Sequence, residues 1–260
     1  MKLRIRQIVA PDASEYERKS RRIDAAAVSE KFEVVEGASD LVHVYGTPGR
    51  MNVPYVASKE PGRALWRRPS PRALITPFNV PEAVEENWFS GAPPTSAALE
   101  TKSAAESAAL HTLGTYIGSR RGVRNQVEQT LARIHRFRDD IAWKTYDIPP
   151  TPADLRDVEV WVDPALDDED FDGFTAEAIV AGKGVVAART PINDHRLEKG
   201  RTGFVVPRTD PNELAHAILA ALFKSEVARL KMNAARQTVG KFRPRQRLRV
   251  LEQVYEATVQ

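Results

Sequence analysis

Residues 157–209 read DVEVWVDPALDDEDFDGFTAEAIVAGKGVVAARTPINDHRLEKGRTGFVVPRT. A short apolar run ends at Asp163-Pro164, an acidic loop follows at 167–172, and the spacing of apolar residues then predicts a helix over 175–181. Further strand patterns complete the stretch, and strands that alternate with helices favour a parallel sheet. Because such sheets bind ligands beyond the carboxyl ends of their strands, we expect the acidic loop to border a ligand site.

The same alternation extends over the rest of the chain. Patterns of apolar residues predict strands at 3–9, 32–35, 40–46, 54–58, 73–76, 110–117, 141–146, 159–162, 184–188 and 204–206. They predict helices at 14–29, 123–137, 152–155, 175–181, 211–223, 226–239 and 244–258. The expected fold class is therefore α/β, with open parallel sheets.

A segment rich in proline, alanine and serine at residues 90–107 predicts a connection between two domains. We expect two Rossmann-like domains, the first of them reduced. The expected divisions are a reduced N-terminal domain at 1–92, a linker at 93–108, a second domain at 109–242 and a C-terminal helix at 243–260 that packs back on the first domain.

Composition excludes several classes of site. The 260 residues contain no cysteine, which rules out disulfides, thiolate nucleophiles and metals held by cysteine. The five histidines lack the paired spacing of a zinc enzyme. No apolar run approaches the ~20 residues that cross a bilayer, and the N-terminus lacks the apolar core of a signal peptide. A cytoplasmic protein is expected.

Positive charge is concentrated in two places, although the net charge is only +3. The first cluster comprises Arg18, Lys19, Arg21 and Arg22. The second comprises Arg63, Arg67, Arg68 and Arg72 around Trp66. Such clusters attract phosphates, but they also occur as solvated helix faces or loops. For the second cluster a peripheral contact with a membrane surface is the partner hypothesis; no nucleic acid is expected, because no motif for binding it occurs.

Two acids near the predicted ligand edge suggest recognition of hydroxyl groups. Glu177 falls in the first turn of the helix expected at 175–181, and Glu169 lies eight residues earlier in the loop. A carboxylate can accept hydrogen bonds from two neighbouring hydroxyls of a ribose or hexose. The alternative is that Glu177 is a helix-end charge favoured by the helix dipole and that Glu169 is a solvated acid.

Several motifs resemble those of the group 1 retaining glycosyltransferases, which have the two-domain GT-B fold. EDFDGFTAEA at Glu169–Ala178 resembles the signature E-G-F-G-x-x-x-x-E-A, and GRTGFVVP at Gly200–Pro207 resembles the turn G-x-T-G-x-L-V-P. DPNELAHAI from Asp210 is similar to the helix opening D-P-x-x-L-A-x-A-I. GSRRGV at Gly118–Val123 sits where the family pairs an arginine and a lysine with the donor pyrophosphate, and DLVHVYG from Asp40 resembles the strand D-V-V-H-x-H.

The resemblance implies transfer of a sugar with retention from a nucleotide-diphosphate sugar, such as a UDP-, GDP- or ADP-sugar, to an unknown acceptor, without a metal or a cofactor. Residues 1–92 would then face the acceptor and 109–242 would bind the donor, across a cleft. The implied catalytic residues are Glu169, Arg120 and Arg121, with Glu169 on the donor sugar and the arginines on the leaving diphosphate. The implied substrate-binding residues are Glu177, on the ribose, with Phe171, Asp172, Gly173, Tyr45 and Thr190.

Departures from the family pattern keep a second hypothesis open. Asp170 and Asp172 stand where the signature has glycines, Pro191-Ile192 where it has Gly-Gly, and Tyr45 where the first-domain strand has its second histidine. His43 is then expected to be a core histidine. The alternative to an active transferase is a non-catalytic relative that binds nucleotide or sugar, or acts as a scaffold; other sugar-nucleotide chemistry on this fold, such as epimerisation, is the third reading.

Overall fold

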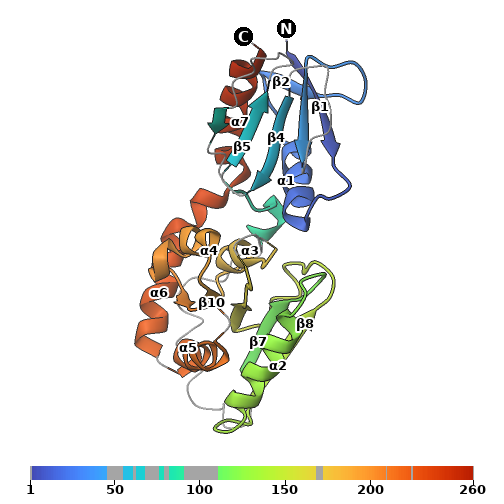
Figure 1. Ribbon diagram of the computed structural model, residues 1–260. Coiled ribbons are helices and arrows are strands. Elements are labelled where there is room, and N and C mark those ends of the chain that lie inside the picture. The colour runs from blue at the N-terminus through green and yellow to red at the C-terminus, as the bar shows by residue number, and fades with distance from the viewer. Residues whose placement is uncertain are drawn as a thin grey trace. The chain divides into compact units, whose positions relative to one another are not determined.

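The computed structural model describes residues 2–45, 55–60, 63–67, 76–78, 82–90, 111–167, 172–208, 210–223 and 225–259. The chain divides into two compact units, which are drawn in Figure 1. Unit 1 comprises residues 1–86 and 240–260, and unit 2 comprises residues 87–239. The linker expected at 93–108 lies outside the described residues. Each unit contains one sheet with helices packed against it.

The sheet of unit 1 is mixed, with strand order β2-β1-β3-β4-β5-β6. Its strands are β1 (Leu3–Val9), β2 (Phe32–Val34), β3 (Leu41–Tyr45), β4 (Tyr55–Glu60), β5 (Arg63–Arg67) and β6 (Thr76–Phe78). Strands β2, β1, β3 and β4 are parallel, whereas β5 and β6 are antiparallel to their neighbours. The expectation of an all-parallel sheet was therefore wrong at this edge. Only residues 61 and 62 separate β4 from β5, and so short a connection can join only antiparallel strands.

Two helices of unit 1 pack on its sheet, α1 (Glu15–Ala26) and α7 (Pro244–Val259). Helix α1 begins with a capping box, because the Ser14 hydroxyl accepts from the Glu17 amide at 3.2 Å and the Glu17 carboxylate accepts from the Ser14 amide at 2.6 Å. Leu251 and Val254 of α7 belong to the same apolar cluster as Ile5 of β1. The last helix of the chain thus completes the core of the unit that contains the first strand. Short 3-10 helices lie at Glu86–Trp88 and Val239–Phe242.

Unit 2 has a parallel sheet with the order β11-β10-β9-β7-β8. Its strands are β7 (His111–Tyr116), β8 (Ile141–Tyr146), β9 (Val160–Asp163), β10 (Gly184–Ala188) and β11 (Phe204–Val206), and every neighbouring pair is parallel. From β7 the chain passes to β8 on one side, whereas from β9 it passes to β10 on the other side. The order therefore reverses between β7 and β9, which is where open α/β sheets bind their ligands.

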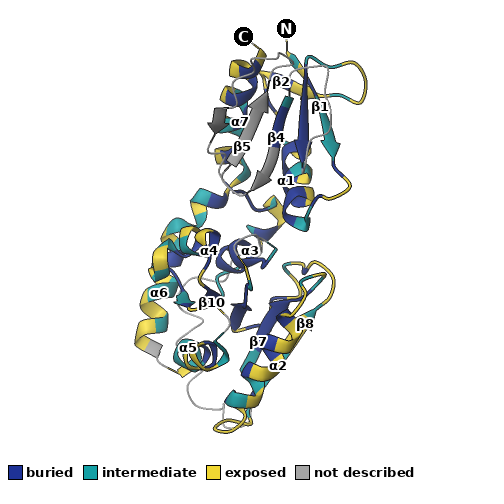
Figure 2. Ribbon diagram, viewed as in Figure 1, coloured by how far each residue is buried: buried dark blue, intermediate teal, exposed yellow. Residues whose placement is uncertain are grey.

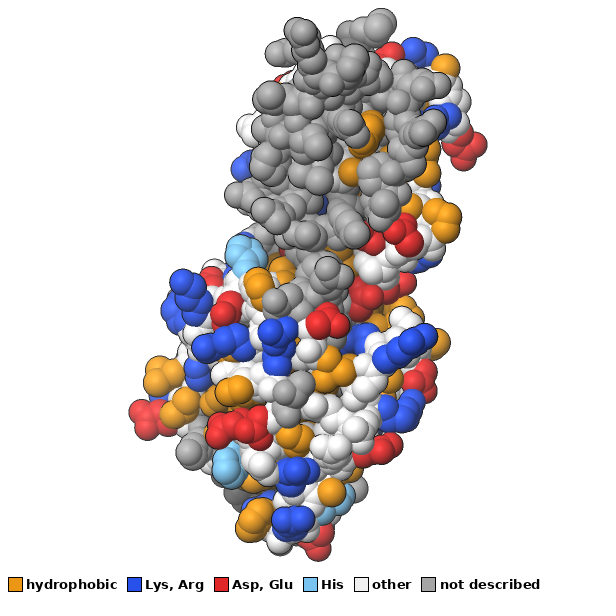
Figure 3. Space-filling view, viewed as in Figure 1, with side chains coloured by type: hydrophobic (Ala, Val, Ile, Leu, Met, Phe, Trp, Pro, Cys, Tyr) orange, Lys and Arg blue, Asp and Glu red, His pale blue; other side chains and the backbone are white. Residues whose placement is uncertain are grey.

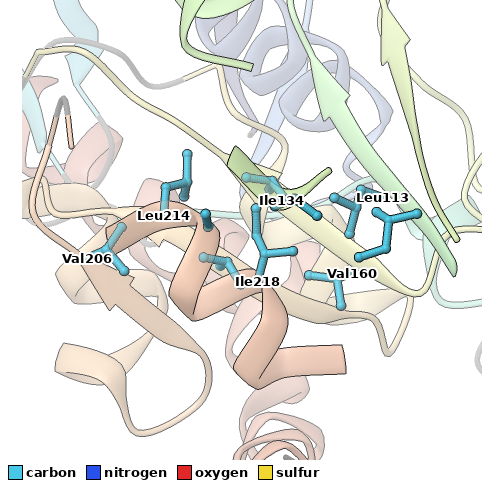
Figure 4. Packing of buried hydrophobic residues seen from close by; sticks show 10 residues of the cluster. Leu113, Ile134, Val160, Val206, Leu214 and Ile218 are labelled. Carbon is cyan, nitrogen blue, oxygen red and sulfur yellow. The ribbon is translucent and has the colours of Figure 1, made fainter. Parts of the chain in front are cut away.

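The helices of unit 2 surround this sheet. They are α2 (Val123–Ile134), α3 (Thr175–Val180), α4 (Pro191–Arg196), α5 (Pro211–Phe223) and α6 (Ser225–Thr238), with a 3-10 turn at Glu198–Gly200. Figure 4 shows Leu113 and Val160 of the sheet packed with Leu214 and Ile218 of α5 in one apolar cluster. Figure 2 shows the burial that results, with buried residues along β7 and exposed residues on α6.

Two local expectations were wrong in unit 2. Residues 152–157 form successive turns in place of the short helix predicted at 152–155. Helix α4 (six residues) was not predicted from the sequence. A cap defines it instead, since the Thr190 hydroxyl accepts a hydrogen bond from the Asn193 amide at 3.1 Å and Pro191 occupies the first helical position.

Candidate functional site

One buried carboxylate lies at the point where the strand order of unit 2 reverses. Asp163 is the last residue of β9, next to β7, and its side chain is fully buried. It accepts three hydrogen bonds, from Arg120 Nη2 at 2.5 Å, Thr175 Oγ1 at 2.9 Å and Asn193 Nδ2 at 2.9 Å. These donors come from the loop between β7 and α2, from the start of α3 and from the first turn of α4. Asp163 therefore connects three segments that surround the predicted ligand edge.

The surroundings of Asp163 keep it ionised. Burial by itself would raise its pKa, but the charges of Arg120 and Arg196 and the hydrogen bond from Asn193 outweigh burial, so its pKa lies below the ordinary value. The carboxylate and the guanidinium of Arg120 thus form a true ion pair inside the protein, with side-chain exposures of 0% and 6%.

Arg120 and Arg121 are adjacent in the sequence but lie in different environments. Besides its pairing with Asp163, Arg120 donates from Nη1 to the Tyr116 carbonyl oxygen at 2.8 Å. Arg121 is exposed and has no hydrogen bond or ion pair to any residue that the structure describes. The fold therefore engages one guanidinium internally and leaves the other available to a ligand.

Arg121 stands directly before the start of α2. The N-cap residue is Gly122, in the left-handed region at φ 82°, and no side chain caps this helix end. Side chains cap α1 (Ser14), α4 (Thr190) and α5 (Asp210), whereas α3, like α2, has no side-chain cap. The first amides of α2 lack intrahelical partners, and a helix N-terminus attracts anions. An uncapped helix end and an unpaired guanidinium thus lie side by side after β7.

The end of the signature stretch is fitted closely around Asp163. Gly173 is buried over the Asp163 carboxylate, and a Cβ atom at this position would overlap the carboxylate atoms. The Gly173 carbonyl oxygen accepts from Trp161 Nε1 at 2.7 Å. Phe174 follows in the left-handed conformation at φ 53°, and its ring packs edge-on against Tyr116 with centroids 4.9 Å apart. A left-handed non-glycine residue costs of order 1–3 kcal/mol, so this turn is maintained by its contacts.

Glu177 and Thr190 both lie inside unit 2. Glu177 is in the first turn of α3 and is fully buried. The Thr190 hydroxyl is used by the cap of α4. Asp172 is described and partly exposed, whereas Glu169 and Phe171 lie outside the described residues. The structure thus brings Gly173, Glu177 and Arg120 to the carboxyl end of the sheet, and the convergence of Glu169 with them stays a prediction.

Tyr45 belongs to a buried polar network of unit 1. Its hydroxyl donates to Asp24 Oδ2 at 2.8 Å, and its ring stacks on His43 with centroids 4.1 Å apart. His43 Nδ1 lies 2.6 Å from the Tyr255 hydroxyl, and burial lowers the pKa of His43 to about 3. The expectation that His43 is a core histidine is confirmed. The Tyr45 hydroxyl is likewise engaged within the protein, so its proposed contact with substrate has no support from this geometry.

The two arginine clusters differ in what the structure describes. In the first, Lys19 and Glu82 are both buried with 3.8 Å between Nζ and Oε1, and Arg22 pairs with Glu15 and Glu85. Two of the four members of this cluster, Lys19 and Arg22, therefore have acidic partners within unit 1. In the second, the backbones of Arg63, Trp66 and Arg67 form β5, while Arg68 and Arg72 lie outside the described residues. The contact with a membrane surface stays a prediction.

The described residues were also compared for surface charge, for groups that could bind a metal and for helices that could cross a membrane. On the face seen in the lower part of Figure 3, Lys and Arg side chains are interspersed with acidic ones. Over the described parts of the chain, His, Asp and Glu form no group of three that could hold a metal ion. No helix within those parts has the length and apolar character needed to cross a membrane.

Three residues of the Asp163 network were not selected from the sequence. Asp163 was noted only as the end of a strand, and Thr175 and Asn193 were not singled out. An acid directly before a proline at a strand end was the available signal for Asp163. For Asn193 the signal was its position in the cap sequence TPIN at 190–193, which fixes it in the first turn of a helix.

Comparisons with known proteins agree with this architecture. Residues 98–223 match the family model described as glycosyl transferases group 1. A glycosyltransferase from Rickettsia africae ESF-5 has a TM-score of 0.60 at 14% identity, over 100% of this chain and 99% of that one. The sucrose-phosphate synthase of Thermosynechococcus elongatus has a TM-score of 0.49 at 18% identity, over 68% of this chain and 51% of the synthase.

The pneumococcal O-GlcNAc transferase GtfA, whose structure contains UDP and GlcNAc, has a TM-score of 0.45 at 13% identity, over 57% of this chain and 36% of its own. No curated protein matches the chain. At these identities the likeness over the full length shows the fold alone, which is that of two Rossmann-like domains of the GT-B kind. The family match is a likeness of residues 98–223 to the group 1 glycosyltransferases.

Proposed function

We propose that this chain is a group 1 glycosyltransferase that takes a sugar from a nucleotide-diphosphate sugar and transfers it with retention, without a metal, to an acceptor bound by unit 1. The observation that carries the proposal is the position of the family match. Residues 98–223 include every described residue at the carboxyl end of the unit 2 sheet, among them Arg121, Asp163 and Glu177. This end of the sheet is the place where folds of this class bind nucleotides.

In this proposal Arg121 and the first amides of α2 receive the diphosphate. Arg121 has an unpaired guanidinium beside an uncapped helix end, and both favour an anion that gains charge as the sugar leaves. Glu177 binds the ribose hydroxyls, and Glu169 contacts the donor sugar. Arg120 does not contact the donor in this proposal, because its guanidinium donates to Asp163 and to the Tyr116 carbonyl oxygen.

A non-catalytic relative that binds nucleotide is the second candidate, and one observation favours it. Of the two arginines expected to neutralise the diphosphate, one is held in a buried ion pair. A single exposed guanidinium suits binding of a nucleotide, whereas departure of a diphosphate benefits from more positive charge. The two candidates share the binding site and differ in turnover.

Nucleotide binding and turnover separate these candidates. The full chain is incubated with UDP, GDP, ADP and their glucose derivatives, and thermal unfolding and release of free sugar are measured. A ligand at 100 times its Kd stabilises the folded protein by about 2.7 kcal/mol. A shift with slow hydrolysis of one donor supports the transferase. A shift without hydrolysis favours the non-catalytic relative, and no shift with any nucleotide contradicts both.

We expect Arg121→Ala to weaken binding of the preferred nucleoside diphosphate by about 10- to 100-fold, because a hydrogen bond to a charged group contributes roughly 1.5–3 kcal/mol. Stability should change little, since Arg121 is exposed and pairs with no described residue. Isothermal titration measures the affinity. The matched control is Arg124→Ala, which removes an exposed guanidinium from the first turn of α2; Arg124 pairs with Asp147 at 2.8 Å. Equal losses in the two variants would show that the effect is general electrostatics and not contact with the diphosphate.

A further inference from the structure

Asp163 is linked to the segments that carry Arg121 and Glu177, two of the proposed donor-binding groups. Its partner Arg120 directly precedes Arg121, and its partner Thr175 lies two residues before Glu177. Its third partner, Asn193, lies in the first turn of α4. The Asn193 side chain binds Asp163, and its backbone N–H donates to the hydroxyl of the cap residue Thr190. One carboxylate thus fixes the starting points of three segments that are 43, 12 and 30 residues away from it in sequence.

The packing around Asp163 shows that this arrangement is specific. Gly173 leaves the space that the carboxylate occupies, since a Cβ atom there would overlap it. Asn193 donates from Nδ2 to both Asp163 and the Ala188 carbonyl oxygen, at 2.9 Å and 3.1 Å, while its buried Oδ1 has no hydrogen-bond partner in the described structure. The two hydrogen bonds that Nδ2 donates therefore orient the Asn193 side chain, although they leave its Oδ1 acceptor unsatisfied.

Stability alone does not account for a network of this kind. Removing a carboxylate and a guanidinium from water costs several kcal/mol for each ion, and apolar residues of similar volume often stabilise a protein equally well. In some proteins, buried charges set a specific arrangement of chain segments. At the carboxyl end of this sheet, the segments in question are those that would contact the donor.

We propose that Asp163 is a positioning residue for donor binding, which holds Arg120, Thr175 and Asn193 so that Arg121 and Glu177 meet one nucleotide diphosphate together. The inference rests on the proposed function and adds to it a residue that contacts no donor atom. Asp163 acts through its three partners, and loss of its charge lets their segments move independently.

Asp163→Asn tests the proposal, with Asp24→Asn as the matched control. Asp24 also pairs with an arginine in the protein interior, at 2.7 Å and 2.8 Å from Arg247, but in unit 1. Affinities for UDP, GDP and ADP are measured by titration at a temperature at which circular dichroism shows each variant folded. Both variants should lose stability. Asp163→Asn should bind the preferred nucleotide at least about tenfold more weakly than wild type, equivalent to about 1.4 kcal/mol. The affinity of Asp24→Asn should stay within about twofold of wild type.

A milder pair of variants covers the case in which Asp163→Asn does not fold. Thr175→Val removes one donor to Asp163 and keeps its charge, whereas Thr130→Val removes an equally buried hydroxyl that donates to the Gln126 carbonyl oxygen at 2.7 Å in α2. We expect weaker nucleotide binding in Thr175→Val and unchanged binding in Thr130→Val. In addition, Arg120→Gln should weaken binding less in the Asp163→Asn background than in wild type, because the two residues act together.

The outcomes separate this inference from the proposed function. If wild type binds none of the three nucleotides, the proposed function is wrong and the inference fails with it. If wild type binds and the Asp163 and Thr175 variants bind equally well, the proposed function stands and the positioning role is wrong. Equal losses in Asp163→Asn and Asp24→Asn, or in the two threonine variants, would assign the effect to general destabilisation and would also overturn the positioning role.

Discussion

Arg247→Met is expected to lower the free energy of unfolding by about 3–5 kcal/mol, the usual cost of breaking a buried ion pair from one side. Arg247 donates from Nε and Nη2 to the two Asp24 oxygens at 2.7 Å and 2.8 Å, and the side-chain exposures are 3% and 2%. Burial alone would lower the pKa of Arg247, but the charge of Asp24 outweighs burial and raises it. The variant leaves the Asp24 carboxylate buried without its cation. Urea unfolding followed by circular dichroism measures the loss.

The effect should be specific to the buried pair. Arg243 immediately precedes α7 and pairs with Glu86 at 2.9 Å, but both side chains are more than half exposed. Arg243→Met should therefore cost less than about 1 kcal/mol. Adding Asp24→Asn to Arg247→Met should recover part of the stability, because the uncompensated charge is removed. Equal destabilisation by the Arg243 and Arg247 variants would show that the ion pair does not anchor α7.

Residues that follow a regular period were predictable from sequence. The alternation in β1 and the compact apolar run of β3 gave strands within one or two residues of their observed ends. Helix α5 was predicted from the capping sequence that begins at Asp210 and Pro211. In the structure, the Asp210 carboxylate accepts from two amides of the first turn. These features depend on neighbours close in sequence, so a local pattern contains the information that determines them.

Elements whose structure depends on distant partners were missed. Strand β5 contains two arginines in five residues and shows no clear strand pattern, yet it pairs with β4 across a two-residue connection. Strand β5 was therefore read only as a basic cluster. The tertiary pairing, and not the local pattern, determines its conformation.

The candidate site shows the same limit at the level of single side chains. Arg120 and Arg121 are neighbours of the same type, and nothing in the sequence distinguishes them. Asp163 distinguishes them, because its carboxylate, 43 residues away in sequence, accepts a hydrogen bond from Arg120. Arg120 is paired inside the protein, whereas Arg121 is exposed. A prediction from sequence could therefore name the pair as diphosphate-binding residues but could not assign the two different roles.

The second large effect is expected from Gly173→Ala. A Cβ atom at Gly173 would overlap the Asp163 carboxylate, whose surroundings are fully buried, so the carboxylate must leave its three donors. Overpacking of this kind typically costs about 1–3 kcal/mol, and the loss of the Asp163 contacts adds to it. Nucleotide binding should fall together with stability, because the segments of Arg121 and Glu177 lose their common anchor. Thermal unfolding and nucleotide titration measure the two effects.

Combining Gly173→Ala with Asp163→Ala separates packing from positioning. Removing the carboxylate makes room for the new methyl group, so the double variant should regain stability relative to Gly173→Ala, while nucleotide binding should remain weak because the anchor is absent. Gly184→Ala is the control in the same unit, since its Cβ would lie 3.4 Å from Val160 Cγ2, an ordinary contact. If the double variant regained nucleotide binding along with stability, the carboxylate would be dispensable and Gly173 would matter only for space. If neither property returned, Gly173 would serve the conformation of the turn before α3 and not the fit of Asp163.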